Sequence, residues 1–212
     1  MTNTAKFSYA ALLLFLISTG MSCKKSDPAN NSNPDAFPAV IANIAPGSMI
    51  DSLRNIGATI YGGSTPAIVN GIYFMQPDSC FYDNSPGNFT GTLFSDYKFR
   101  FTNQNNTSFT INVEQKSIPA GNLSPTPAQT FISGQGNNFS IFILRTVSPS
   151  GIPVEQFNIL SGTLTTGGIQ NFQNILYYRS KGSDPGNTLP PAGTIRRFVN
   201  GGAGLAVTTT TF

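Results

Sequence analysis

The residues that decide the fold are numbers 131–144, FISGQGNNFSIFIL. Two apolar runs flank Gly136-Asn137, and the glycine supplies the positive φ that a two-residue hairpin turn requires. Such a turn predicts three cross-strand pairs: Ile132 with Ile141, Phe131 with Phe142, and Gly134 with Phe139. Both faces of the second strand carry bulky apolar side chains. This strand is therefore expected between two packed layers, or in a barrel whose outer face is also covered.

A second hairpin is predicted upstream, between Tyr97–Thr102 and Phe109–Glu114. Apolar and polar residues alternate in both segments, which is typical of strands with one face in water. Since paired side chains share one side of a sheet, this parity favours a three-residue loop, Gln104–Asn106, with Asn106 in the left-handed conformation. The expected pairs are Phe101 with Phe109, Phe99 with Ile111, and Lys98 with Asn112.

Further strands are predicted along the rest of the chain. They are expected at residues 71–75, 157–164, 172–178 and 194–199, with a last edge strand at 204–210. The 21 glycines and 15 prolines suit the many turns that short strands need. Strands this numerous, without a long helix, restrict the architecture to an antiparallel barrel or a sandwich. Consecutive hairpins favour an all-β antiparallel meander that closes as a barrel, and a two-sheet β-sandwich is the alternative.

One short helix is predicted before the strands. Ser48 suits its N-cap, Gly57 its C-terminal stop, and apolar residues recur between them at helical spacing. The apolar stripe must pack on another element, and the open end of the barrel is the expected place. A helix in this position resembles the end plug of lipocalin-like barrels.

The N-terminus has the pattern of a secretory signal peptide over residues 1–22. Lys6 precedes an apolar run at 10–17, and small residues then lead to Cys23. A cysteine at the first mature position is what bacterial lipoprotein processing requires, because its thiol carries the diacylglycerol. We therefore expect export, lipidation of Cys23, and attachment to the outer membrane or cell surface through this lipid. Ordinary cleavage would leave the same Cys23 without lipid, and the run is too short for a spanning helix of about 20 residues.

The mature chain is expected to divide into a tether and one domain. Residues 23–47 are mostly polar, with little apolar surface to bury, which predicts a flexible tether. Residues 48–212 suit a single β domain. Cys80 is expected to be buried as a small apolar residue, and it has a partner for a disulfide only if Cys23 carries no lipid.

Residue content excludes several classes of function. Charged residues make up 10% of the chain and the net charge is +3, so no surface for nucleic acid is predicted. The chain has no histidine, which removes His-based triads, general bases and metal ligands. One cysteine beyond Cys23 is too few for a soft-metal site. No catalytic residue, metal or cofactor is expected.

A non-catalytic binding module is the predicted function. Because charges are few while 17 Phe and 7 Tyr are present, ligand contacts should be aromatic and should suit a small apolar or carbohydrate-like ligand. The candidate contacts are Tyr73, Phe99, Phe142 and Tyr178. A structural or adhesion component that docks to a partner protein is the alternative.

Two other sites follow from short patterns. The predicted hairpin brings Asp96 opposite Glu114, and facing carboxylates would suit a carboxylate-dependent glycan hydrolase, the catalytic alternative. Asp51-Ser52-Leu53 is similar to bacterial O-glycosylation sites in exported proteins, which makes Ser52 a candidate for modification.

Several segments resemble those of a family of Bacteroidota-type surface lipoproteins. They are Ile60–Ala67, Gly71–Tyr73, Ser161–Thr163, Gly168–Phe172 and Gly201–Leu205. Gly20, where an aliphatic residue is usual before the lipidated cysteine, also fits lipoproteins of this type. The resemblance implies a shared β fold and a cell-envelope location. Its motifs are turns and strand starts, so it implies no activity.

Overall fold

The structure is a computed structural model that describes residues 36–124, 127, 129–202 and 204–212. The predicted signal peptide and Cys23 lie outside these residues. Two helices, α1 (Ala39–Ala42) and α2 (Gly47–Asn55), precede the strands, and a 3-10 turn covers Pro149–Gly151. The strands are β1 (Ser64–Pro66), β2 (Gly71–Met75), β3 (Asp78–Asp83), β4 (Leu93–Phe94), β5 (Asp96–Asn105), β6 (Thr110–Ile118), β7 (Gln129–Gly136), β8 (Asn138–Val147), β9 (Val154–Thr165), β10 (Gly168–Lys181), β11 (Ile195–Asn200) and β12 (Leu205–Thr209).

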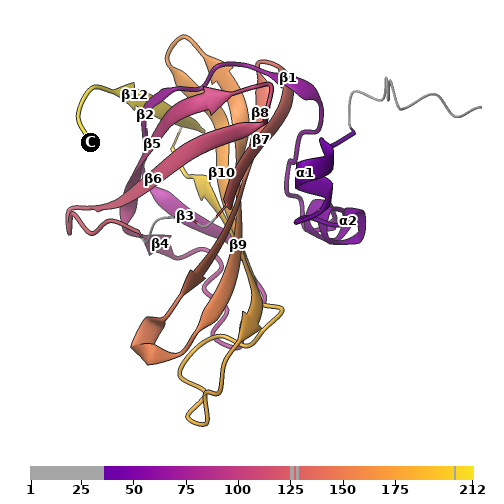
Figure 1. Ribbon diagram of the computed structural model, residues 1–212. Coiled ribbons are helices and arrows are strands. Elements are labelled where there is room, and N and C mark those ends of the chain that lie inside the picture. Colours follow the sequence, from indigo (N-terminus) through magenta and orange to yellow (C-terminus); the bar gives the residue numbers. More distant parts are fainter. Residues whose placement is uncertain (1–35, 125–126, 128, 203) are drawn as a thin grey trace, which may run out of the picture. The chain divides into compact units, whose positions relative to one another are not determined.

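Eight strands close into an antiparallel meander barrel, which confirms the predicted fold class (Figure 1). The order around the ring is β12, β2, β5, β6, β7, β8, β9 and β10, and β10 pairs with β12 to close it. The expectation of an edge strand at 204–210 is wrong, because β12 has a neighbour on both sides. Gly168 permits the closure, since a Cβ there would collide with the carbonyl oxygen of Ala206 on β12.

One edge of strand β10 pairs with two different strands in succession, while its other edge pairs with β9. Its first residues, Gly168–Gln170, pair with β12, and after a bulge Gln173–Tyr177 pair with β11. The sheet continues from β11 to β3 and β4, and β1 joins β7 as a parallel partner. Figure 1 shows β8, β9 and β10 running beyond the ring to its lower end, where the loop 182–194 follows β10. We call this the extended end of the barrel.

The Gly136-Asn137 hairpin has the predicted register in all three pairs. Strand β8 is buried on both sides, because Ile141 belongs to the core inside the barrel and Phe142 to a second core on its outer wall. The inner core is dominated by aromatic rings. Its most deeply buried phenylalanines are Phe99, Phe101, Phe139 and Phe172.

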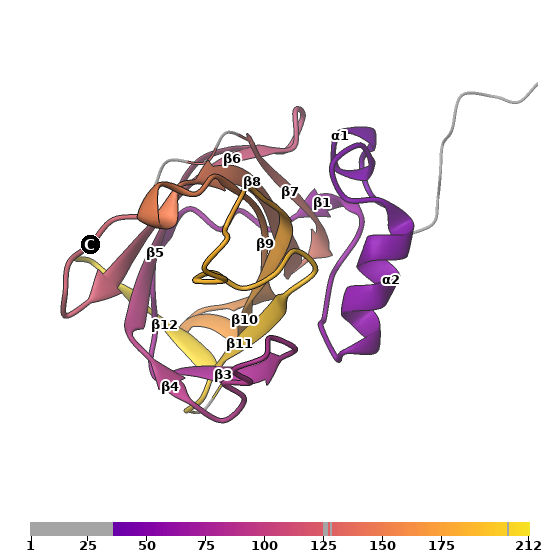
Figure 2. The same cartoon turned by 90° about the horizontal axis from the view of Figure 1, so that it is seen from below.

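The second core lies between the helices and the outer wall. Ile50 and Leu53 of α2 cluster there with Phe142 and Phe157, and Figure 2 shows α1 and α2 beside the wall that contains β7 to β10. The expectation that the helix plugs an open end is therefore wrong. The outward apolar face of β8 and β9 has to be covered, and the helices cover it.

The folded part begins before residue 48, where the tether was expected to end. Ile41 of α1 is completely buried in the second core. Helix α2 starts at Gly47 after Pro46 and has no side-chain cap, so Ser48 does not act as its N-cap. Gly57 takes a positive φ of 82° just beyond the helix, as expected of a C-terminal stop.

The upstream hairpin is correctly located but its predicted register is wrong by four residues. Phe101 pairs with Val113 and Phe99 with Gln115. A shift of four preserves parity, so Phe99 and Phe101 still point into the inner core. The turn is longer than expected: a bulge follows Thr102, and the left-handed residues are Asn103 and Phe109 instead of Asn106.

A long-range contact explains the longer turn. The Gln104 side chain accepts a hydrogen bond from the backbone of Val69 at 2.8 Å and donates to the carbonyl of Ala67 at 2.8 Å. These bonds tie the tip of the hairpin to the segment between β1 and β2. A turn prediction based only on neighbouring residues cannot take these long-range hydrogen bonds into account.

Candidate functional site

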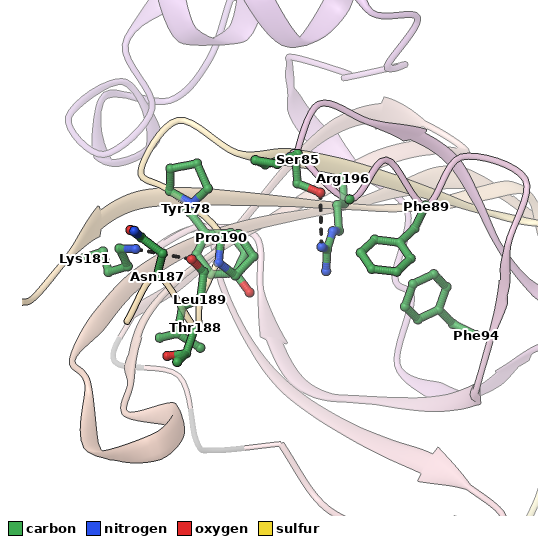
Figure 3. A pocket seen from close by; sticks show the side chains of 13 residues that line it. Ser85, Phe89, Phe94, Tyr178, Lys181, Asn187, Thr188, Leu189, Pro190 and Arg196 are labelled. Atoms are coloured by element: carbon green, nitrogen blue, oxygen red, sulfur yellow. Dashed lines mark hydrogen bonds between the residues drawn. The ribbon is translucent and has the colours of Figure 1, made fainter. Parts of the chain in front are cut away.

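A pocket of about 500 Å³ opens at the extended end of the barrel (Figure 3). We call it the end pocket. One wall comes from the segment that follows β3, and the other from the loop 182–194. Its lining consists of Ser85, Pro86, Gly87, Phe89, Phe94, Tyr178, Lys181, Asn187, Thr188, Leu189, Pro190, Pro191 and Arg196.

The first wall is organised by the buried carboxylate of Asp83. It accepts hydrogen bonds from the backbone of Ser85 at 2.7 Å and of Phe89 at 3.0 Å, and from Arg196 Nε at 3.1 Å. Burial alone would raise the pKa of the Asp83 carboxyl, but these hydrogen bonds and the Arg196 charge outweigh it and lower that pKa. Asp83 thus stays ionised and holds Phe89 at the pocket.

The second wall is organised by Asp184. Its carboxylate accepts bonds from Lys181 Nζ at 2.9 Å, from the backbone of Thr188 at 3.0 Å and from the backbone of Leu189 at 2.9 Å. The hydrogen bond from Lys181, followed by those from Leu189 and Thr188, lowers the pKa of the Asp184 carboxyl well below its usual range. A loop of this length is thereby given a defined shape beside the pocket.

The surface of the end pocket is mainly apolar and its charges are balanced. Figure 3 shows Phe89 and Phe94 on one side, and their rings meet edge to face with centroids 6.1 Å apart. The two cations, Lys181 and Arg196, are each paired with a carboxylate. Arg196 also lies over the Phe89 ring at 4.9 Å. Such a lining suits an uncharged ligand with an apolar face.

A polar row crosses the inner wall of the barrel at the same end. Arg145 on β8 pairs in register with Gln156 on β9, which pairs with Tyr178 on β10. All three line a second pocket of about 450 Å³, which we call the Arg145 pocket. Tyr178 and Leu189 lie in both pocket walls. Burial lowers the pKa of the Arg145 guanidinium, and the hydroxyls of Tyr97 and Tyr178 act in the opposite direction.

Asp78 on β3 is the carboxyl group whose pKa is raised most clearly. Its side chain is buried, Oδ1 has no hydrogen-bond partner among the described residues, and its pKa rises from 3.8 to about 7. Burial is the main cause, and the charge of Asp96 adds to it. Asp78 lines neither of the two pockets above.

The four predicted ligand contacts do not form one cluster. Tyr73 and Phe99 lie in the inner core, and Phe142 lies on the outer wall, where its ring meets Phe37 edge to face at 5.6 Å. Tyr178 alone of the four lines the end pocket and the Arg145 pocket. The aromatic residues that line the end pocket with it, Phe89 and Phe94, are missing from the prediction.

The other predicted sites have different outcomes. Cys23 lies outside the described residues. Ser52 is exposed on α2, and its hydroxyl donates to the carbonyl of Ser48 at 2.8 Å. The predicted contact between Asp96 and Glu114 is wrong: in the shifted register Asp96 pairs with Ile118, and Glu114 forms an ion pair with Arg100. Cys80 is buried in the inner core and forms no disulfide within the described part of the chain.

Two sequence signals point to other pocket residues that the prediction missed, Arg145 and the loop 182–194. The inward alternation Phe139, Ile141, Ile143 continues to Arg145, which places a cation on an otherwise apolar inner face. The segment 182–194 contains three prolines and three glycines in a long connection between strands, and such loops often carry function.

The described residues contain no group of three or more His, Cys, Asp or Glu side chains that could hold a metal ion. Within the same part of the chain, no helix is long and apolar enough to cross a membrane. Comparison with family models, with curated proteins and with solved structures finds no match for this chain.

Proposed function

We propose that this is a lipid-anchored cell-envelope protein whose barrel binds a small neutral ligand, apolar or carbohydrate-like, in the end pocket. The observation that carries the ligand proposal is the end pocket itself. Its volume of about 500 Å³ lies within the range of small-molecule sites, and its surface is mainly apolar, with aromatic and proline residues in both walls. Phe89, Phe94 and Tyr178 supply faces on which an apolar body or a sugar ring can pack.

The charge balance supports a neutral ligand. Lys181 and Arg196 already have carboxylate partners in Asp184 and Asp83, so an anion would have to displace existing ion pairs. The same carboxylates hold the two walls in place, which reduces the ordering that binding requires.

Binding should be tested by calorimetry on the folded chain, with a panel of neutral mono- and disaccharides and straight-chain alcohols. Phe89→Ala should weaken binding of the ligand identified by about tenfold, because it removes one aromatic wall of the pocket. The matched control is Phe81→Ala, which removes an equally large, 59% exposed ring that lines neither pocket. No binding by any panel member, or equal affinity in wild type and Phe89→Ala, would contradict the proposal.

The anchor rests on Cys23 and on the resemblance to Bacteroidota-type surface lipoproteins. In a lipoprotein-competent host, mass spectrometry should find a mature N-terminus at Cys23 that carries the added mass of the lipid. Cys23→Ser should abolish this modification and release the protein from the membrane fraction. An unmodified Cys23, or a mature terminus elsewhere, would show that the anchor is wrong.

Docking to a partner protein is the second candidate, and one surface favours it. Phe81 on β3 is 59% exposed and Leu93 on the edge strand β4 is 64% exposed. They share one face of the sheet, because Ser79, two residues before Phe81, pairs with Leu93. This surface is separate from the end pocket, so loss of a partner in Phe81→Ala would leave ligand binding intact.

A further inference from the structure

We propose that the Arg145 pocket binds a small organic carboxylate, held by the Arg145 guanidinium with Gln156 and Tyr178 as neutral hydrogen-bond partners. This site is distinct from the one in the proposed function and does not depend on it. Its walls contain Arg145, Gln156, Tyr178, Val147, Pro149 and Leu189, among other residues.

The first observation is that Arg145 is a buried cation with no counterion among the described residues. Its residue is 9% exposed, and Nε is fully buried with no hydrogen-bond partner among the described residues. Four other cations of the described chain do have carboxylate partners: Arg100 with Glu114, Arg179 with Glu155, Lys181 with Asp184, and Arg196 with Asp83. No carboxylate of the described residues forms such a pair with Arg145.

The second observation is where the side chain lies. Ile141 and Ile143 on the same strand face the inner core, so by alternation Arg145 also faces inward, at the extended end where the pocket opens. Arg197 also has a buried Nε that no described residue bonds, but it packs over the Phe81 ring at 4.3 Å and lines neither pocket. Arg145 is therefore the buried, unpaired guanidinium that a ligand entering this pocket would meet.

The energetic argument follows from burial. A charged group taken out of water is strongly destabilising unless an opposite charge or hydrogen bonds compensate for the lost hydration. The groups that face Arg145 are neutral: Gln156 on β9, Tyr178 on β10, and Tyr97 on β5. A bound anion would supply the missing compensation.

The chemistry of the site selects a carboxylate. A single guanidinium balances one negative charge, and its planar fork matches the two oxygens of a carboxylate. A phosphate dianion would leave a charge uncompensated, because the neighbouring polar groups are neutral. Val147, Pro149 and Leu189 add apolar surface, which suits an organic body attached to the carboxylate.

The test compares charged and uncharged ligands of the same shape. Benzoate and butyrate, and their amides benzamide and butyramide, are titrated into the folded chain in a Tris buffer free of other carboxylates. At least one carboxylate should bind and raise the melting temperature, while its amide should bind at least tenfold more weakly. Failure of both carboxylates to bind, or equal binding of the amides, would overturn the proposal.

Variants then assign the binding to the guanidinium. Arg145→Gln should weaken carboxylate binding at least tenfold, and without ligand it should melt at the same or a higher temperature, because an uncompensated buried charge is gone. Arg179→Gln removes the same charge from β10, which β9 separates from β8, at a position outside both pockets, and its carboxylate affinity should stay within twofold of wild type. Unchanged affinity in Arg145→Gln would overturn the proposal.

A second variant of Arg145, a phosphate titration and Phe89→Ala complete the test. Should Arg145→Gln fail to fold, Arg145→Lys keeps the charge without the fork, and a loss of fivefold or more supports the assignment while unchanged affinity overturns it. Inorganic phosphate that binds more tightly than benzoate would overturn the choice of a carboxylate. Phe89→Ala, which alters only the end pocket, should retain carboxylate affinity, so failure of the neutral-ligand proposal remains distinguishable from failure of this one.

Discussion

Asp78→Asn should remove most of the pH dependence of stability between about pH 4 and pH 7. In the native protein, burial and the charge of Asp96 raise the pKa of the Asp78 carboxyl from 3.8 to about 7. The folded state therefore binds a proton that the unfolded state releases, and wild-type stability should fall as the pH rises through this window. A difference of roughly three pKa units corresponds to about 4 kcal/mol.

The asparagine variant has no carboxyl at this position, so the fall should be absent. Between pH 4 and pH 8 the free energy of unfolding of wild type should fall by up to about 4 kcal/mol more than that of the variant. Carboxyls with lowered pKa values, such as Asp83 and Asp184, lose their stabilising contribution only below about pH 4, so they do not interfere.

Urea denaturation at pH 4, 5.5, 7 and 8 would measure this effect. The control is Asp51→Asn, which changes an exposed carboxyl on α2 and should follow the wild-type pH profile. A wild-type stability that is constant or rises from pH 4 to pH 8 would contradict the prediction. It would mean that the Asp78 carboxyl ionises in the folded protein without penalty.

Phe99→Ala should lower the free energy of unfolding by about 3–5 kcal/mol, the range for removing a large aromatic side chain from a core. Phe99 is completely buried, and its ring meets Phe172 edge to face at 5.1 Å and Phe101 at 6.4 Å. Because these rings come from β5 and β10 on different sides of the barrel, the cavity cannot be closed by a local shift of one strand.

Urea unfolding monitored by circular dichroism would measure the loss. Phe81→Ala is the control, since it deletes the same ring at a 59% exposed position and should cost less than about 1 kcal/mol. A loss below about 1 kcal/mol in Phe99→Ala would indicate that the barrel interior is not filled around this ring. Phe99 would then regain its place among the candidate ligand contacts.

The two hairpins show how far local sequence information reaches. In the β7–β8 hairpin the turn residues and the apolar pattern point to the same register, and that register is found. In the β5–β6 hairpin the apolar alternation predicts the strand faces correctly, but the predicted turn and register are wrong. Its turn depends on Gln104, which hydrogen-bonds to the chain near Ala67 and Val69 instead of closing a short local loop. Phe99 and Phe101 still face the inside of the barrel, because the register shift is an even number of residues.

The candidate site was predictable only in small part. Tyr178 was identified as an aromatic on a strand, but nothing local distinguishes it from Tyr73 or Phe99, which lie in the core. The end pocket forms where the segment after β3 meets the loop after β10, about 100 residues later in the chain. Asp83 and Asp184 shape its walls through hydrogen bonds to nearby backbone groups, a role that appears only once both loops have a conformation.

By itself, then, the sequence determined an all-β antiparallel meander, the alternation of side chains between the two faces of its strands, and the register of the hairpin at Gly136, because alternation and turn chemistry act between neighbouring residues. Only the tertiary structure decided that β12 closes the ring into a barrel, that the helices cover the outer wall, and that Arg145 is a buried cation in the lining of a pocket. The physical reason is that barrel closure, the packing of the helices and the pairing of charges all depend on residues far apart in the chain. The free energy of each interaction depends on which residues become neighbours once the barrel has formed.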